Sequence, residues 1–203
     1  MSKSMIKAVL LDYGGVIADE GFQNGLRAMA REQNLDQEAM MMVAKNAVYD
    51  SGFILGQGSE QEFWAMMRDG SGLSGSDEAL TKRVLDGFVL RPWMIAQIEK
   101  WRNQGFLTVI LSDQSHWLDT LNERDDFFKL FDHVFNSYYM AKGKRDPSLF
   151  IEIAEKLSLA PSEILFLDDI KGNIKRAEDA GWKTIFVKDK QSCLLTIDAF
   201  TPS

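Results

Sequence analysis

Oxygen-bearing side chains end three of the apolar runs in this sequence. They are Asp12, Ser112 and the adjacent pair Asp168-Asp169, while Lys144 lies in a short basic stretch elsewhere in the chain. Carboxylates that are brought together repel one another unless a cation neutralises them, and a cluster of oxygen ligands suits Mg²⁺ better than a softer metal. A carboxylate beside Mg²⁺, an ammonium group and a hydroxyl could attack a phosphoryl group in line to form an aspartyl-phosphate. These residue types predict phosphoryl transfer as a reaction class.

The apolar runs also predict the elements that must position these side chains. Short continuous apolar runs are typical of strands that are buried on both faces of a parallel sheet. The runs lie at residues 5–11, 106–111, 164–167 and 184–187, with a weaker fifth at residues 132–135. Segments with helical spacing separate them, at residues 92–105, after Asp146-Pro147, and at residues 173–180. This alternation predicts an open α/β sheet, whose ligands bind outside the carboxyl ends of the strands.

Residues 18–90 interrupt the alternation and carry no convincing strand. Phe22, Leu26 and Met29 recur at helical spacing, and the stretch Ser59-Glu60-Gln61-Glu62 has the capping-box pattern that opens a helix. The predicted fold class is therefore α/β. Residues 1–17 and 91–203 would form a Rossmann-like open parallel sheet, and residues 18–90 a small helical domain inserted after the first strand.

The composition excludes several classes of protein. The chain has 203 residues, a net charge of −7, two histidines and one cysteine, Cys193. The acidic balance argues against nucleic acid and membrane partners, and a lone cysteine allows neither an internal disulfide nor a cysteine-based zinc site. The N-terminal stretch lacks the pattern of a cleavable signal, and no apolar stretch is long enough to span a membrane. We expect a cytoplasmic protein, either a monomer or a homodimer, that acts on a small molecule.

Four local patterns occur in order along the chain, each at a predicted strand end or helix. They are Val9-Leu10-Leu11-Asp12-Tyr13-Gly14-Gly15-Val16, Val109-Ile110-Leu111-Ser112-Asp113, Lys144-Arg145-Asp146-Pro147-Ser148-Leu149-Phe150, and Asp168-Asp169 followed by Asn173, Ala177 and Gly181. With these motifs the chain resembles the haloacid dehalogenase superfamily of phosphohydrolases over nearly its whole length. It is most similar to the helical-cap phosphatases whose first motif reads Asp-x-Gly-Gly-Val. The resemblance implies that residues 18–90 form a cap that closes over the site and selects the substrate.

The resemblance also implies a Mg²⁺ site. Asp12 would be both the nucleophile and a metal ligand, and the carbonyl oxygen of Gly14 would be a second ligand. Asp169 would bind the metal directly, and Asp168 would bind it directly or through a water molecule. The cofactor implied in this way is Mg²⁺, held by Asp12, Gly14, Asp168 and Asp169.

A phosphate site is implied by the second and third motifs. Ser112 and the backbone of Asp113 would hold the phosphoryl oxygens, and Lys144 would neutralise their charge. The implied catalytic residues are therefore Asp12, Ser112 and Lys144, and the implied partner is a small phosphorylated substrate.

Position 14 departs from the family pattern. Most phosphatases of the family carry a second aspartate there, which protonates the leaving group and later activates water. Gly14 can do neither, and losing a general acid–base group typically costs ~10² to 10⁴ in rate unless another group replaces it. From the sequence, the candidates for that replacement are Asp113, Asp19 and His116. Arg145 stands where proline is usual.

The sequence as a whole predicts a Mg²⁺-dependent phosphatase that hydrolyses a small phosphorylated metabolite, with sugar phosphates as the leading substrate class. Two other enzymatic activities stay open, a dehalogenase and a phosphonatase. The Asp168-Asp169 pair argues against the dehalogenase, and a phosphonatase would need an imine-forming lysine in the insert, such as Lys45. A non-enzymatic alternative is a regulatory module that binds phosphate and has lost turnover with Gly14.

Overall fold

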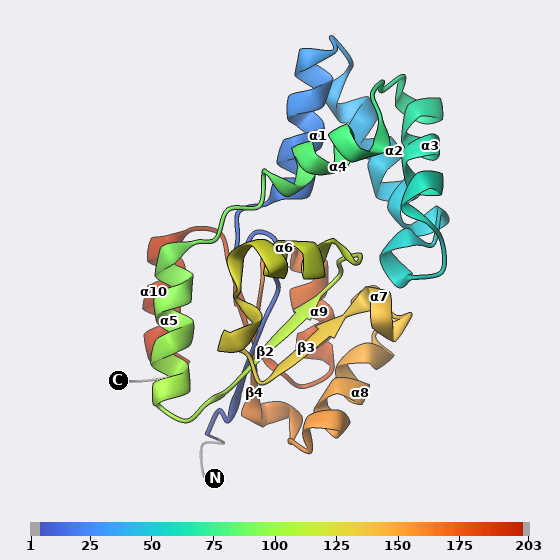
Figure 1. The fold of residues 1–203 in the computed structure, drawn as a ribbon. Coiled ribbons are helices and arrows are strands. Elements are labelled where there is room, and N and C mark those ends of the chain that lie inside the picture. The colour runs from blue at the N-terminus through green and yellow to red at the C-terminus, as the bar shows by residue number, and fades with distance from the viewer. Residues whose placement is uncertain (1–4, 201–203) are drawn as a thin grey trace.

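The computed structural model describes residues 5–200 and contains a five-stranded parallel sheet (Figure 1). The strands are β1 (Ala8–Leu11), β2 (Leu107–Ser112), β3 (His133–Asn136), β4 (Ile164–Asp168) and β5 (Lys183–Phe186). Their order in the sheet is β3-β2-β1-β4-β5, and every neighbouring pair is parallel. All five predicted strands are present within one or a few residues of their expected bounds, so the predicted open α/β sheet is confirmed.

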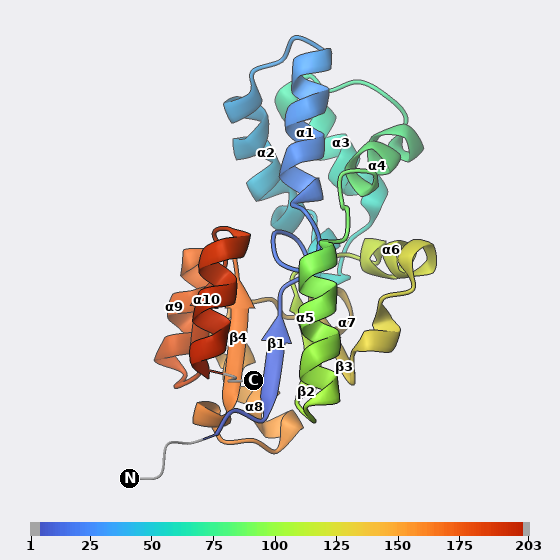
Figure 2. The same cartoon turned by 90° about the vertical axis from the view of Figure 1, so that its left-hand side faces the viewer.

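Helices cover both faces of the sheet (Figures 1 and 2). On one face lie α5 (Pro92–Asn103) and α10 (Lys190–Phe200), and on the other lie α8 (Ser148–Leu157) and α9 (Lys171–Asp179). Alternate residues of β1 enter different cores, since Val9 and Leu11 belong to the first cluster and Ala8 and Leu10 to the second. Burial on both faces is the physical reason for the continuous apolar runs.

Helices also follow two of the strands at the edge where the carboxyl ends lie. These are α6 (Trp117–Asp125), after β2, and the short α7 (Ser137–Met140), after β3. Short 3₁₀ turns lie at Phe53–Leu55, Phe128–Leu130 and Pro161–Glu163. The loops between each strand and its following helix therefore gather at one edge of the sheet.

Residues 18–90 form four helices that stand beyond that edge (Figure 1). They are α1 (Gly21–Glu32), α2 (Gln37–Asp50), α3 (Glu60–Ser71) and α4 (Asp77–Leu85). The two connections to the rest of the chain run side by side, because Ala18 and Leu90 form a bridge and the Arg91 amide donates to the Ile17 carbonyl at 2.9 Å. The division of the chain into a core and an inserted domain stays a prediction.

The capping box predicted at Ser59 is present at the start of α3. The Glu62 amide donates to Ser59 Oγ at 3.1 Å, and the Ser59 amide donates to Glu62 Oε2 at 2.8 Å. Within residues 5–200, no helix has both the length and the apolar character that crossing a membrane requires. Residues 1–4, which begin the stretch predicted to hold no cleavable signal, lie outside the described residues.

Phe150 offers a test of the second core. Its fully buried ring contacts the rings of Phe166 and Trp182, with centroid distances of 5.9 and 5.2 Å. Phe150→Ala is expected to lower the free energy of unfolding by about 3–5 kcal/mol, because it leaves a cavity between β4 and α8. Urea unfolding measures this loss.

The neighbouring Ile151 provides a matched control on the same helix. It is 56% exposed, so Ile151→Ala is expected to change stability by no more than about 0.5 kcal/mol. Equal effects of the two substitutions would contradict the packing described for this face of the sheet.

Candidate active site

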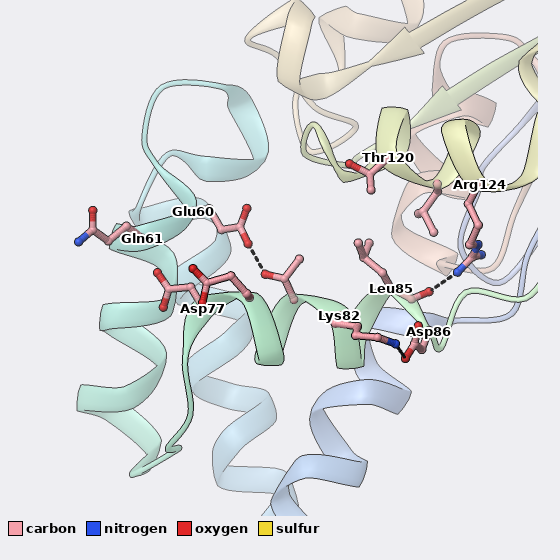
Figure 3. Close-up of a pocket in the computed structure, with 11 residues that line it drawn as sticks. Glu60, Gln61, Asp77, Lys82, Leu85, Asp86, Thr120 and Arg124 are labelled. Carbon is pink, nitrogen blue, oxygen red and sulfur yellow. Dashed lines mark hydrogen bonds and ion pairs between the residues drawn. The ribbon is translucent and has the colours of Figure 1, made fainter.

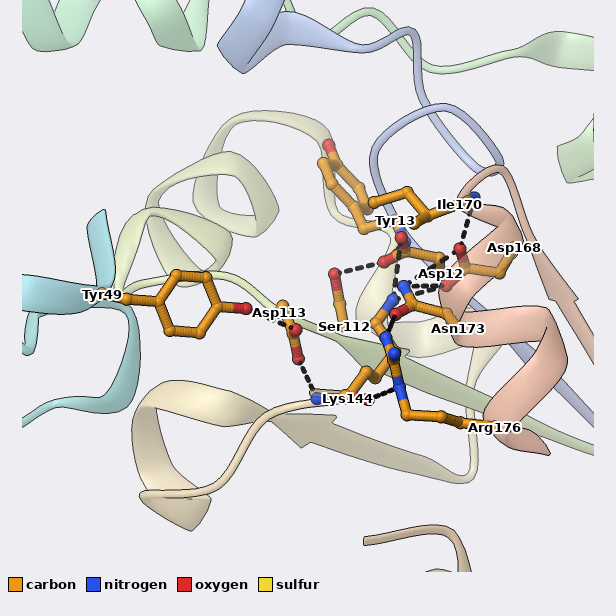
Figure 4. Close-up of polar contacts among 10 residues, drawn as sticks. All are labelled: Asp12, Tyr13, Tyr49, Ser112, Asp113, Lys144, Asp168, Ile170, Asn173 and Arg176. Carbon is orange, nitrogen blue, oxygen red and sulfur yellow. Dashed lines mark hydrogen bonds and ion pairs between the residues drawn. The ribbon is translucent and has the colours of Figure 1, made fainter. Parts of the chain in front are cut away.

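Asp12 lies at the centre of the polar cluster on the carboxyl edge of the sheet (Figure 4). It follows the central strand β1 directly and is only 7% exposed. Ser112, the last residue of β2, donates from Oγ to Asp12 Oδ1 at 2.7 Å, and Lys144 Nζ lies 2.8 Å from Asp12 Oδ2. The sheet thus brings together the three residues that the sequence predicts as catalytic, and each oxygen of the Asp12 carboxylate has a partner.

Lys144 is a fully buried ammonium group between two carboxylates. Its Nζ lies 2.8 Å from Asp12 Oδ2 and 2.7 Å from Asp168 Oδ2. Burial alone would lower the pKa of Lys144, but Asp12, Asp168 and Asp113 together raise it above its ordinary value. The side chain is therefore charged at neutral pH, and its charge offsets part of the charge of the carboxylates around it.

The backbone of Lys144 is held by two side chains from other elements. Its amide donates to Asp113 Oδ1 at 2.8 Å, and its carbonyl accepts from Arg176 Nε at 2.6 Å. Because Arg176 lies on α9, this bond links the lysine backbone to that helix, and Arg176 also donates to Asn173 Oδ1 at 2.6 Å. These contacts fix the position of an ammonium group that a flexible side chain alone would not hold in place.

Asp168 is surrounded by donors, whereas Asp169 is less engaged. The Ile170 amide donates to Asp168 Oδ1 at 2.7 Å, and Asn173 Nδ2 lies 3.1 and 3.0 Å from the two Asp168 oxygens. Burial raises the pKa of Asp169 to about 7, and the charges of Asp12 and Asp168 add to this effect. Asp169 is therefore a carboxylate that still needs a neutralising partner.

Three carboxylates of this cluster could hold a metal ion together. One oxygen from each of Asp12, Asp168 and Asp169 lies within 4.8 Å of the others. An all-oxygen donor set of this kind fits Mg²⁺, which binds through one or two carboxylates and keeps several water ligands. The predicted fourth ligand, the Gly14 carbonyl, lies on the loop that follows Asp12 and stays a prediction.

Gly15 is required for the close approach of this loop to Asp169. Its φ of +75° lies in the left-handed region, and a Cβ placed on it would lie 2.0 Å from Asp169 Oδ2. Glycine meets both conditions, because it has no Cβ and adopts positive φ at little cost. The sequence contains Gly15 within the first motif, but only the structure gives it a role.

Of the sequence candidates for the missing acid, Asp113 lies in the site but is already engaged. Its carboxylate accepts from the Lys144 amide and, at 3.0 Å, from the hydroxyl of Tyr49 on α2. The Arg145 guanidinium lies 3.5 Å from the centre of the Tyr49 ring, so the residue that replaces the usual proline packs against the helical insert. The predicted phosphate contact through the Asp113 backbone stays a prediction.

The other two candidates, Asp19 and His116, lie elsewhere. Asp19 Oδ1 accepts from Arg91 Nε at 2.9 Å, and its side chain is more than half exposed. His116 Nε2 lies 3.4 Å from Glu60 Oε2. Neither is among the described residues that line the cavity around Asp12.

A cavity of about 350 Å³ joins the polar cluster to the helical insert. The core contributes Asp12, Gly14, Ser112, Lys144 and Asp169, and the insert contributes Glu20, Phe22, Met41, Lys45, Tyr49 and Phe53. A small molecule bound there would contact charged groups from the core and both charged and apolar groups from the insert. Sequence reasoning assigned no role to Glu20 or Tyr49, because no local pattern shows that α1 and α2 reach this edge.

A larger hollow of about 630 Å³ lies between helices of the insert and helix α6 of the core (Figure 3). Its lining comes from α3, α4 and α6, and its charged groups are largely paired, as in the Lys82–Asp86 ion pair at 2.6 Å. Arg124 donates there to the Leu85 carbonyl at 3.0 Å. None of the carboxylates around Lys144 lines it, so the chemistry belongs to the smaller cavity.

A family model matches most of the chain. Residues 6–181 match the family model of the haloacid dehalogenase-like hydrolases. The chain therefore belongs to this family, as its four motifs predict.

Two curated relatives match about half of the chain. Bifunctional epoxide hydrolase 2 from Rattus norvegicus is 31% identical over 107 residues, which cover 49% of this chain and 19% of that protein. Enolase-phosphatase E1 from Klebsiella oxytoca is 32% identical over 113 residues, which cover 49% of this chain and 48% of that protein. The matched regions thus span a fifth to a half of these relatives.

Solved structures match over nearly the whole chain. A haloacid dehalogenase family enzyme from Bacteroides thetaiotaomicron, in complex with magnesium and inorganic phosphate, has a TM-score of 0.67 and 21% identity. The match covers 93% of this chain and 98% of that one. L-2-haloacid dehalogenase from Xanthobacter autotrophicus has a TM-score of 0.65 and 18% identity, over 98% of this chain and 84% of that one. At these identities the matches establish the shared fold.

Removing the buried ammonium group should destabilise the protein strongly. Lys144→Met leaves Asp12 and Asp168 facing each other without a cation, which is expected to cost about 3–5 kcal/mol in the presence of a chelator. Lys175→Met is the control, because Lys175 forms an exposed ion pair with Asp179 and its loss should cost less than about 1 kcal/mol. Chemical unfolding of both variants measures the difference. A small loss for Lys144→Met would show that its charge is not needed to keep the carboxylates together.

Gly15→Ala is expected to weaken the binding of Mg²⁺. The added Cβ would push the Asp169 carboxylate away from the cluster, and the left-handed backbone would cost about 1–2 kcal/mol in addition. Gly105→Ala is matched for backbone strain, since Gly105 has a φ of +83° and its added Cβ would meet no described atom within 4 Å. Urea unfolding should show a loss of stability in both variants, and calorimetric titration with MgCl₂ should show weaker Mg²⁺ binding in Gly15→Ala alone. Equal Mg²⁺ affinities would contradict this role of Gly15.

Proposed function

We propose that this protein is a Mg²⁺-dependent phosphatase that acts on a small phosphorylated metabolite. The observation that carries the proposal is the position of the Asp12 carboxylate, which lines the cavity and lies between the Ser112 hydroxyl and the Lys144 ammonium group. The clustered carboxylates of Asp168 and Asp169 support the choice of metal. The similarity to enolase-phosphatase E1 supports a phosphatase among the reactions of the family.

In this mechanism, one oxygen of Asp12 attacks the phosphorus atom of the substrate, and the bond to the leaving oxygen breaks. The Ser112 hydroxyl and the Lys144 ammonium hold the phosphoryl oxygens and offset the charge that develops on them. Mg²⁺ would further neutralise the charge on the phosphoryl oxygens. Its ligands would be Asp12, Asp169, the Gly14 carbonyl and Asp168, the last directly or through water. Water then attacks the aspartyl-phosphate, releases inorganic phosphate and restores the Asp12 carboxylate.

The helical insert would act as the cap that selects the substrate. Its contribution to the cavity is mostly apolar, from Phe22, Met41 and Phe53, and the volume of about 350 Å³ suits a small molecule. Sugar phosphates are the leading class, because of the Asp-x-Gly-Gly-Val form of the first motif. We further propose a cytoplasmic monomer or homodimer that binds neither nucleic acid nor membranes.

A phosphonatase is the second candidate, and one observation favours it. Lys45 of α2 lines the cavity and could form an imine with a carbonyl group next to a phosphonate. A dehalogenase is disfavoured, because halide displacement needs no metal and gives no role to the acidic pair Asp168-Asp169. The regulatory alternative predicts phosphate binding without turnover.

Phosphate release from a panel of sugar phosphates, other small phosphoesters and a carbonyl-bearing phosphonate tests the proposal. Wild-type protein is expected to release phosphate from a sugar phosphate with Mg²⁺ and not with chelator. Asp12→Asn removes the nucleophile and is expected to lower the rate by about 10³-fold or more. Asp179→Asn, in an exposed ion pair on α9, is the matched control and should keep the full rate.

Release that persists in Asp12→Asn or in chelator would overturn this mechanism. Release from the phosphonate alone would favour the phosphonatase. No release from any compound, with folding and Mg²⁺ binding intact, would favour the regulatory module.

A further inference from the structure

The absence of a side chain at Gly14 leaves the proposed reaction without an obvious proton donor. An alkoxide leaves slowly unless it is protonated as the bond to phosphorus breaks, so a phosphatase for sugar phosphates needs an acid near the leaving oxygen. The direction in which a side chain at position 14 would point shows where to look. A Cβ placed on Gly14 would lie 3.3 Å from the Phe88 ring and 3.7 Å from Glu20 Oε1.

Glu20 therefore brings a carboxylate from the insert to the position that a side chain at residue 14 would approach. Glu20 also lines the cavity together with Asp12 and Gly14. It comes six residues after Gly14 in the sequence, outside the first motif, so the motif gives no sign of this position. The Glu20 carboxylate thus lies near the place where a carboxylate side chain at position 14 would extend.

The structure holds Glu20 in place from two sides. Its Oε2 accepts from the Gln23 amide at 2.7 Å at the start of α1, which leaves Oε1 as the oxygen nearer to Gly14. The next residue, Gly21, packs so closely on Phe88 that an added Cβ would lie 2.4 Å from that ring. Since the start of α1 is fixed in this way, Glu20 is a preorganised group and not a mobile surface acid.

The surroundings of Glu20 favour a carboxyl group that can exchange a proton near neutrality. Burial raises its pKa to about 7; the hydrogen bond from the Gln23 amide opposes this rise, and the charge of Asp12 adds to it. An acid with a pKa near the working pH is the most effective proton donor and acceptor. The three candidates taken from the sequence lack this combination, because Asp113 is already engaged and Asp19 and His116 lie outside the cavity.

We propose that Glu20 is the general acid and general base of this protein, in place of the aspartate side chain that is absent at position 14. This inference rests on the proposed phosphatase function. In the first step Asp12 forms a bond to phosphorus, the bond from phosphorus to the leaving oxygen breaks, and the Glu20 proton passes to that oxygen. In the second step the Glu20 carboxylate takes a proton from water, whose oxygen attacks the aspartyl-phosphate. The bond from phosphorus to Asp12 breaks, phosphate leaves, and Glu20 is protonated again.

Substrates with different leaving groups test this role of Glu20. p-Nitrophenyl phosphate releases a stable phenolate that needs no proton, whereas a hexose phosphate releases a sugar oxygen that does. In Glu20→Gln, kcat/KM for the hexose phosphate is expected to fall by about 10²- to 10⁴-fold. For p-nitrophenyl phosphate it should fall by less than about tenfold, because kcat/KM reports formation of the aspartyl-phosphate and not its hydrolysis.

A burst of nitrophenol, one per protein molecule, is also expected in Glu20→Gln. The variant forms the aspartyl-phosphate from the aryl substrate but lacks the base that activates water for its hydrolysis. Glutamine keeps an oxygen that can accept from the Gln23 amide, so the start of α1 should be preserved. Glu38→Gln, at an exposed position on α2, is the control and should leave kcat/KM unchanged for both substrates.

Three results would overturn the proposal. Equal losses of kcat/KM for both substrates in Glu20→Gln would mean that Glu20 supports the shape of the cavity and does not donate a proton. No loss for the hexose phosphate would mean that another group donates the proton. Wild-type protein that hydrolyses neither substrate would instead overturn the proposed phosphatase function, and the role of Glu20 with it.

Discussion

A buried ammonium group between two buried carboxylates is the interaction on which this site depends. Lys144 Nζ lies within 2.8 Å of both Asp12 and Asp168. Charges that are removed from water are stable only when they are paired and hydrogen-bonded almost completely. Ser112, Asn173 and the amides of Tyr13 and Ile170 donate further hydrogen bonds to the two carboxylates. Lys144 thus offsets part of the negative charge of the carboxylates that the sheet brings together.

The parallel sheet is what makes such a cluster possible. Asp12 and Ser112 are 100 positions apart in the chain, yet they meet because β1 and β2 are neighbours and end at the same edge. Strand β4 lies on the other side of β1, so Asp168 approaches Asp12 from the opposite direction. The central position of β1 therefore places one carboxylate between polar groups from two strands, which is where ligands bind in open α/β sheets.

The helical insert completes the site from above this edge. Tyr49 donates to Asp113, and Glu20 lies near the backbone of Gly14, so the insert and the core both reach the cavity. The core contributes Asp12, Ser112 and Lys144 to the cavity, and the insert contributes the charged groups of Glu20 and Lys45 beside apolar side chains. Both parts of the chain therefore supply groups that a bound ligand would contact, as expected where a rigid scaffold is combined with variable connecting segments.

The sequence by itself determined the five strands, the membership of the family and the set Asp12, Ser112, Lys144, Asp168 and Asp169. These features are local, because burial on both faces of a strand requires an apolar run, Asp12, Ser112 and the Asp168-Asp169 pair end such runs, and Lys144 belongs to a short motif of its own. The roles of Gly15, Arg176, Tyr49 and Glu20 were decided only by the tertiary structure. Each role depends on a close approach that exists only in the folded chain. Gly15 approaches Asp169, Arg176 the Lys144 backbone, Tyr49 Asp113, and Glu20 the position that a side chain at residue 14 would occupy. No local pattern encodes such an approach, because these distances are set by how separate segments of the core and the insert pack on one another.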